Sequence, residues 1–166
     1  MILVLAAALA AAQPPACPDV VTAQAFVCRA TEASKAGDSA AAAGAFEQAA
    51  QQVDSASAEA AKLWAAAGNM WIAAGQPGKA AVDLDKALAD SSLQGGQRGE
   101  ALLDRARAAE AQNDLKTARA KASEAASTIS ADPFLWYFSA ALAIREGENR
   151  SVEEGESASV AKPRNV

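Results

Sequence analysis

The amino-acid sequence predicts an all-α fold of stacked antiparallel helical hairpins, about three and a half of them in 166 residues. Alanine is abundant, and because it is the best helix former and fills a core poorly, we expect closely packed helices. Runs of Val, Ile, Thr and Tyr with period-two alternation, which would indicate strands, are missing. An internal repeat of 38 residues predicts where the helices and turns lie.

The repeat is marked by three turn residues, Gly37, Gly75 and Asn113, each 38 residues after the one before. Glycine and asparagine suit the left-handed residue that ends a helix, and Asp38 and Asp114 stand where the next helix needs an N-cap. Each unit therefore reads as helix, tight turn, helix. The alanines that keep the spacing after each turn are Ala42, Ala80, Ala118, Ala49, Ala87 and Ala125.

The segment before each turn repeats as well. Large apolar residues stand in one register at Phe26, Trp64 and Leu102. Small residues follow four positions later, and the one at Gly68 predicts a close contact between helices. The stretch PFLWYFSAALAIREG is a fourth half-copy, in which Trp136 takes the place of Trp64.

The sequence AEAAKLWAAAGNMWIAAGQPGKAAVDLDKALAD resembles a tetratricopeptide repeat (TPR). The matching positions are Trp64, Gly68, Trp71, Gly75, Ala80 and Ala87. The resemblance implies a TPR-like helical repeat domain over residues 20–147. The spacing of 38 exceeds the family's usual 34, which indicates about one additional helical turn or a longer loop per unit. The alternative fold is an irregular antiparallel helical bundle.

The resemblance also implies that a peptide or partner helix binds the concave groove lined by the first helices. The main peptide-binding candidates by register are Lys62, Asn69, Ile72, Leu103, Arg107 and Tyr137, and the others are Val27, Thr31, Ala65, Glu110, Ala141 and Ile144. Two interpretations stay open for Asn69, a grip on the ligand backbone or a solvated helix residue. Arg107 either pairs with a ligand carboxylate or with Asp104 or Glu110 nearby.

The aromatic run at Phe134–Phe138 predicts a second surface. Five large apolar residues in a row cannot share one helix face. We expect Trp136, with Ala140 and Ala143, to pack on the preceding hairpin. Phe134, Tyr137 and Phe138 should then form an exposed apolar interface for a partner or for self-association. The alternative is that the longer hairpins fold over these residues or that the tail forms a poor helix across them.

Catalytic chemistry has little support in the sequence. The chain has no histidine, and neither cysteine has a base to activate it, so we expect no enzyme activity, no cofactor and no metal site. The carboxylates Asp83, Asp85 and Glu110 are expected on polar helix faces. The net charge of −5 with interspersed signs argues against nucleic-acid binding.

The two ends of the chain complete the expected organisation. Residues 1–12 read as a signal peptide with cleavage near 12/13, residues 13–19 as an N-terminal segment, and residues 148–166 as a polar flexible tail. No membrane span is expected after signal removal. Cys17 and Cys28 form a disulfide if the protein is exported, or stay free thiols in a reducing compartment.

These observations leave two classes of function open. The first is an exported bacterial TPR-containing adaptor, periplasmic or secreted, which binds a peptide or partner helix through its groove or through its apolar C-terminal helix. The second is a structural component of an envelope complex, or a helical protein that associates with itself as a homo-oligomer. A cytoplasmic location is the alternative to export.

Overall fold

The computed structural model describes residues 17–89 and 91–160, with side chains placed as far as Ser151. The expected signal peptide, most of the segment 13–19 and residues 161–166 lie outside this range. The described residues form seven helices and no strand, which confirms the all-α prediction. The helices are α1 (Ala23–Lys35), α2 (Ser39–Ala50), α3 (Ala58–Ala73), α4 (Pro77–Leu88), α5 (Gly95–Ala111), α6 (Leu115–Ala125) and α7 (Pro133–Val160).

The three repeated turns have the conformation that the sequence predicts. Gly37, Gly75 and Asn113 have φ angles of 79°, 68° and 62°, in the left-handed region that ends a helix. In each turn the residue that follows donates its backbone N–H to a carbonyl five positions back, for example Gln76 to Trp71 at 2.9 Å. The turns therefore satisfy the last carbonyls of α1, α3 and α5 and reverse the chain within three residues.

Side-chain caps then start the next helices. Asp38 accepts a hydrogen bond from the backbone N–H of Ala41 at 2.9 Å, and Asp114 accepts one from Thr117 at 3.0 Å, as expected of N-caps. Pro77 stands at the first position of α4, where its missing N–H removes no helical hydrogen bond. The three short turns thus have local causes that are visible in the sequence.

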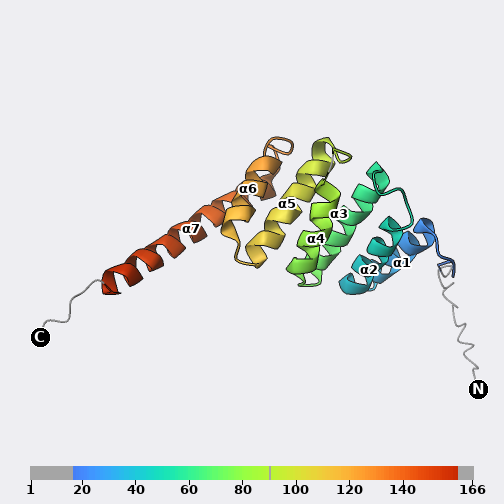
Figure 1. Cartoon of the computed structure of the whole chain (residues 1–166), viewed down its shortest axis with the longest axis horizontal. Coiled ribbons are helices and arrows are strands. Elements are labelled where there is room, and N and C mark those ends of the chain that lie inside the picture. Colours follow the sequence, from blue (N-terminus) through green and yellow to red (C-terminus); the bar gives the residue numbers. More distant parts are fainter. Residues whose placement is uncertain (1–16, 90, 161–166) are drawn as a thin grey trace, which may run out of the picture.

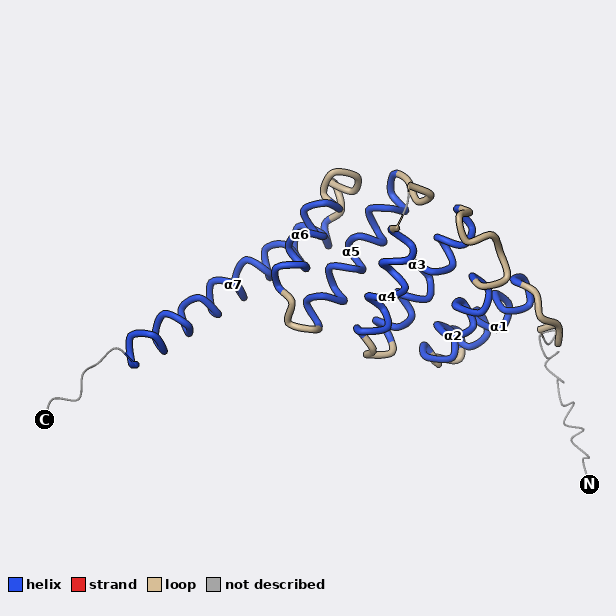
Figure 2. The backbone as a smooth tube through the Cα atoms, viewed as in Figure 1, coloured by secondary structure: helices blue, strands red, loops and turns tan. Residues whose placement is uncertain are grey.

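The helices follow one another in a row (Figure 1). Each helix packs against its neighbours in sequence, and α3 also contacts α5. Figure 2 shows the short turns along one edge of the row and the longer connections between hairpins along the other. The first helices of the successive hairpins, α1, α3 and α5, therefore follow one another along the row.

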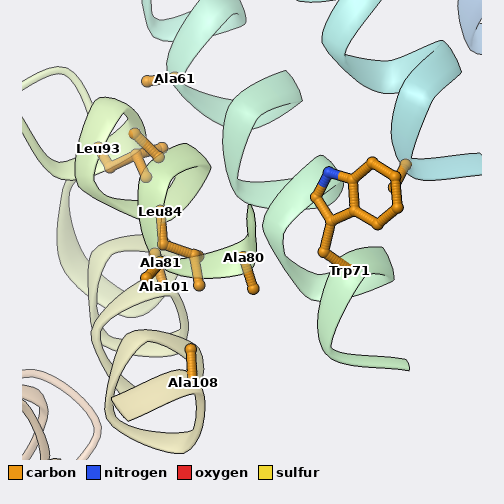
Figure 3. Close-up of a cluster of buried hydrophobic side chains, with 10 residues drawn as sticks. Ala61, Trp71, Ala80, Ala81, Leu84, Leu93, Ala101 and Ala108 are labelled. Atoms are coloured by element: carbon orange, nitrogen blue, oxygen red, sulfur yellow. The ribbon is translucent and has the colours of Figure 1, made fainter. Parts of the chain in front are cut away.

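The central core is made mostly of small residues from α3, α4 and α5, with Leu84 and Leu93 as its largest fully buried side chains. Figure 3 shows Leu84 together with Ala80 and Ala81 on α4, in the same cluster as residues of the neighbouring helices. A Cβ added to Gly68 would come within 2.5 Å of the Leu84 Cγ, so the close contact predicted at Gly68 is confirmed. Small residues let the helices approach and one leucine fills the remaining space.

A disulfide fastens the N-terminal segment to α1. Cys17 and Cys28 are bonded, with their Cα atoms 5.7 Å apart, which confirms the predicted pairing. Arg29 supports the same segment by donating to the carbonyl oxygens of Pro18 at 2.8 Å and Val20 at 2.9 Å. The chain before α1 is therefore held against the first helix.

The packing face of α7 differs from the prediction. Leu135, Phe138 and Leu142 are buried against α5 and α6. The prediction that Trp136 packs on the preceding hairpin is therefore wrong, and so is the prediction that Phe138 points away. The expected register was one residue out, because a period of 34 brings Trp136 into line with Leu102, whereas the structure packs Leu135 there. Ala140 and Ala143, expected in the contact, are exposed.

The end of α7 also differs from the expected boundary at Gly147. The helix continues to Val160, so residues 148–160 belong to α7 instead of forming a separate tail. Figure 1 shows that this half of α7 extends away from the row of helices. The polar composition predicted an absence of packing there, and a helix in this segment was only the alternative, because no apolar periodicity marks it.

Candidate binding groove

A groove of about 570 Å³ lies over α1, α3 and α5. It lies where the first helices of three hairpins come together. Its residues are Thr31, Ser34, Lys35, Phe46, Lys62, Ala65, Ala66, Asn69, Met70, Leu93, Gln97, Glu100, Ala101 and Asp104.

The groove has an apolar floor and rims of opposite charge. Alanines, Phe46 and Met70 supply apolar surface without filling the hollow. Lys35 and Lys62 line the side formed by α1 and α3, whereas Glu100 and Asp104 come from α5. A concave apolar surface with a few placed polar groups is the usual form of a ligand site in proteins.

A chain of polar contacts runs from the groove to α7. Asn69 donates from Nδ2 to Asp104 Oδ2 at 2.7 Å, and Arg107 donates to the other oxygen of Asp104 at 2.8 Å. The Arg107 guanidinium also lies over the ring of Phe134, 5.6 Å from its centroid. Asp104 therefore joins α3 to α5 by accepting from both Asn69 and Arg107. Of the two interpretations of Arg107, the structure contains the ion pair with Asp104.

The structure brings some of the sequence-predicted residues together and separates others. Lys62 and Asn69, with Thr31 and Ala65, line the groove. Leu103 is only 7% exposed and belongs to the core between α5, α6 and α7, so its predicted role in the groove has to be corrected. The remaining residues lie outside the groove lining: Ile72 and Val27 are half-buried, Glu110 is paired with Arg145, Tyr137 and Ile144 are exposed on α7, and Ala141 is half-buried there.

Sequence reasoning missed the acidic rim and part of the floor. Glu100 lies four residues before Asp104, which places both on one face of α5, and this spacing was the available signal. Leu93 comes from the loop before α5, for which the repeat register makes no prediction. Phe46 lies on a second helix, outside the set that the resemblance implies.

A second cluster joins α2, α3 and α4 around two carboxylates. Asp83 is only 2% exposed, which corrects its expected place on a polar face. Lys86 donates to Asp83 Oδ1 at 2.9 Å, while Asp83 Oδ2 is buried without a hydrogen-bond donor in the structure. Burial raises the pKa of Asp83 above its ordinary value of 3.8, and the Glu47 carboxyl beside it acts in the same direction against the lowering effect of Lys86.

Both tryptophans of this hairpin belong to the same cluster. The Trp71 indole donates from Nε1 to Glu47 Oε1 at 2.6 Å, across from α3 to α2. Lys86 Nζ lies 3.7 Å from the centroid of the Trp64 ring, and Lys79 Nζ lies 4.1 Å from that of Trp71. The arrangement fastens three helices by charge and aromatic contacts.

Comparisons with known proteins add no family assignment, because no family model matches the chain and no curated protein matches it significantly. Within residues 17–89 and 91–160, no helix combines the length and apolar character needed to cross a bilayer. The same residues contain no group of three or more His, Cys, Asp or Glu side chains arranged to hold a metal ion.

Proposed function

We propose that the chain is a TPR-like α-solenoid of about three and a half repeats and acts as a non-enzymatic module that binds a peptide or partner helix. The observation that carries this proposal is the groove over α1, α3 and α5, whose lining combines apolar side chains with Asn69. Stacked helical repeats bind extended ligands on a concave surface, which here would be formed by the first helices of successive hairpins.

The charges of the groove favour a ligand with a matching polarity. Lys62 favours acidic groups on the side of α3 and Glu100 favours basic groups over α5, whereas Lys35 and Asp104 already pair with Glu32 and Arg107. A segment with apolar residues between an acidic and a basic end fits this pattern. We infer that the Asn69 side chain hydrogen-bonds to the ligand backbone. It either releases its hydrogen bond to Asp104 first or keeps that bond while it binds the ligand.

The same proposal includes export to the periplasm or the medium. The Cys17–Cys28 bond is compatible with an oxidising compartment, and the apolar run at residues 2–12 is compatible with a signal peptide. A cytoplasmic location is the alternative. N-terminal sequencing of the protein from its native host decides between them: a mature start near Gln13 supports export, and an intact Met1 in the cytosol contradicts it.

Peptide display against the full chain tests the groove. Selected peptides should carry the apolar centre and opposite charges described above, and Ala66→Trp, which fills the groove, should abolish their binding in fluorescence polarisation. Ala73→Trp places the same ring on an exposed position of α3 outside the groove lining and is the matched control. Equal affinities of both variants and the parent chain would place the ligand elsewhere.

A second candidate function is structural: assembly into an envelope complex or association with further copies of the chain. The observation that favours it is the exposure of large apolar side chains on α7. Trp136 is 67% exposed and Tyr137 74%, and Phe134 and Ile144 are also largely exposed. Exposed apolar residues gathered on one element mark interaction surfaces in soluble chains.

A further inference from the structure

Asp83 has a buried carboxyl oxygen without a hydrogen-bond donor. Its side chain is only 3% exposed, and Oδ1 accepts a hydrogen bond from the Lys86 ammonium at 2.9 Å. Oδ2 is out of contact with solvent, and among the described residues no donor lies within hydrogen-bonding distance of it. An ionised carboxylate with an unsatisfied buried oxygen costs free energy, so a hydrogen is expected at this place from another source.

The group beside Asp83 on the neighbouring second helix is another carboxyl. Glu47 of α2 lies close enough to Asp83 of α4 for a hydrogen bond between the two side chains, and both line one hollow of about 410 Å³. Glu47 Oε1 accepts from the Trp71 indole at 2.6 Å, so α3 fixes the orientation of Glu47. Two adjacent carboxyls repel each other when both are ionised and form a hydrogen bond when one of them is protonated.

The cations nearby do not compensate two negative charges at this place. Lys86 is the cation that acts on Asp83. Lys79 lines the same hollow, but its ammonium lies over an indole ring of α3, 4.1 Å from the centroid. On α5, which also packs against α4, Arg105 is paired with Asp85. Burial is the largest cause that raises the pKa of Asp83, and the Glu47 carboxyl acts in the same direction.

We propose that Asp83 bears a hydrogen on Oδ2 and donates it to the Glu47 carboxylate, so that one proton joins α2 of the first hairpin to α4 of the second. The two carboxyls then have a combined charge of −1, which Lys86 balances, and both oxygens of Asp83 have partners.

The proposed link is sensitive to pH. When the pH rises, the O–H bond of Asp83 breaks, its proton passes to water or buffer, and the electron pair stays on Oδ2. Two negative charges then face each other in a largely buried site, and α2 and α4 are pushed apart. The link is therefore complete at low pH and is lost as the pH rises through the folded-state pKa of Asp83.

The test is a ¹³C NMR titration of the full chain with labelled aspartate and glutamate. The Cγ of Asp83 and the Cδ of Glu47 should respond in one common step, with its midpoint above the ordinary 3.8, because a single shared proton is lost. The indole N–H signal of Trp71 should shift in the same step, since this group donates to Glu47.

Two variants separate a shared proton from a merely buried carboxyl. Glu47→Gln keeps an oxygen for Trp71 and places an amide donor beside Asp83, so the Asp83 midpoint should fall by at least about one pH unit. Asp83→Asn supplies a permanent donor to Glu47, so the Trp71 signal should lose its step. Glu59→Gln removes the same charge from an exposed position at the start of α3 and is the matched control, with the titration of the parent chain expected.

A common step in the parent chain, together with a lower Asp83 midpoint in Glu47→Gln alone, supports the proposal. Separate steps for the two carboxyls, or an Asp83 midpoint at or below its ordinary value, overturn it. Equal shifts in Glu47→Gln and Glu59→Gln also overturn it, because they would show a general effect of charge. If Glu47→Gln fails to fold, the titration of the parent chain and the Trp71 signal of Asp83→Asn decide between these outcomes.

Discussion

At Gly68 the absence of a side chain sets how closely α3 approaches α4. Leu84 occupies the space beside it and has no exposed surface, so it has nowhere to move. We expect Gly68→Leu to lower the free energy of unfolding by about 1–3 kcal/mol or more through overpacking. Urea denaturation followed by circular dichroism measures the change.

Gly44→Leu is the control for this prediction. Gly44 lies inside α2, and a Cβ there would meet no atom within 4 Å. Leucine also has a better helix propensity than glycine, by up to about 1 kcal/mol. A Gly68→Leu chain as stable as Gly44→Leu would mean that the two helices do not meet at Gly68.

Asp83 makes the stability of the chain depend on pH. Because its folded-state pKa is raised by burial, its protonated form stabilises the fold, and this contribution is full below pH 3.8 and is lost as the pH rises through the folded-state pKa. In the Asp83→Asn variant this side chain carries no charge at any pH. We therefore expect its urea midpoint, relative to that of the parent chain, to increase between pH 4 and pH 7.

Asp85→Asn provides the comparison for Asp83. Asp85 is exposed and pairs with Arg105, with 2.7 Å between Nε and Oδ1. Exposed ion pairs contribute about 0–1 kcal/mol, so the variant should follow the pH dependence of the parent chain. If Asp83→Asn and Asp85→Asn gave the same profile, the buried carboxyl would not be the source of the pH dependence.

At the scale of the element, α1 depends on a covalent link as well as on packing. The disulfide closes a loop with a sequence separation of 11, which limits its stabilisation to roughly 3 kcal/mol. We expect the Cys17→Ser, Cys28→Ser chain to melt at a lower temperature than the parent chain under oxidising conditions. Under reducing conditions the two should melt together, and a difference that persists there would have a cause other than the bond.

The elements differ in how far their sequences determine them. The turns at Gly37, Gly75 and Asn113 were predictable because a left-handed backbone restricts the residue type. Asp83 was misplaced although it lies between Ala80 and Ala87 on the apolar side of α4, because a carboxylate is normally assigned to solvent.

The packing face of α7 and the lining of the groove were predicted less well than the turns. The face of α7 was misassigned because repeat spacing outweighed the plain three–four pattern of Leu135, Phe138 and Leu142. The groove could be predicted only in part. Register places Lys62 and Asn69 on the concave side, but the approach of Glu100 and Asp104 depends on how α5 lies against α3.

At the scale of the whole molecule, a row of helices is stabilised by neighbours, and its ends have fewer of them. The central helices α3, α4 and α5 have packed neighbours on both sides, whereas α7 packs on the row along one face of its first half. Hydrogen exchange at low protein concentration should therefore show the strongest amide protection in α3 and α5 and the weakest in α7 after Gly147.

The same measurement at high concentration tests the self-association that belongs to the second candidate function. If α7 pairs with a second copy, amides after Gly147 should gain protection as the concentration rises, while those of α3 should stay unchanged. A gain of equal size in all helices would reflect general stabilisation and would count against pairing through α7.

The three tryptophans lie in three different environments, and this gives the molecule its own optical probes. Trp71 is buried and donates to a carboxylate, Trp64 is half-buried under a lysine, and Trp136 is exposed while its indole donates to the Ser130 carbonyl oxygen at 2.7 Å. Acrylamide should quench the emission of Trp136 first and that of Trp71 last. A ligand in the groove would leave the Trp136 component unchanged, whereas a second copy seated on α7 would shield it, so one fluorescence titration distinguishes occupancy of the two surfaces.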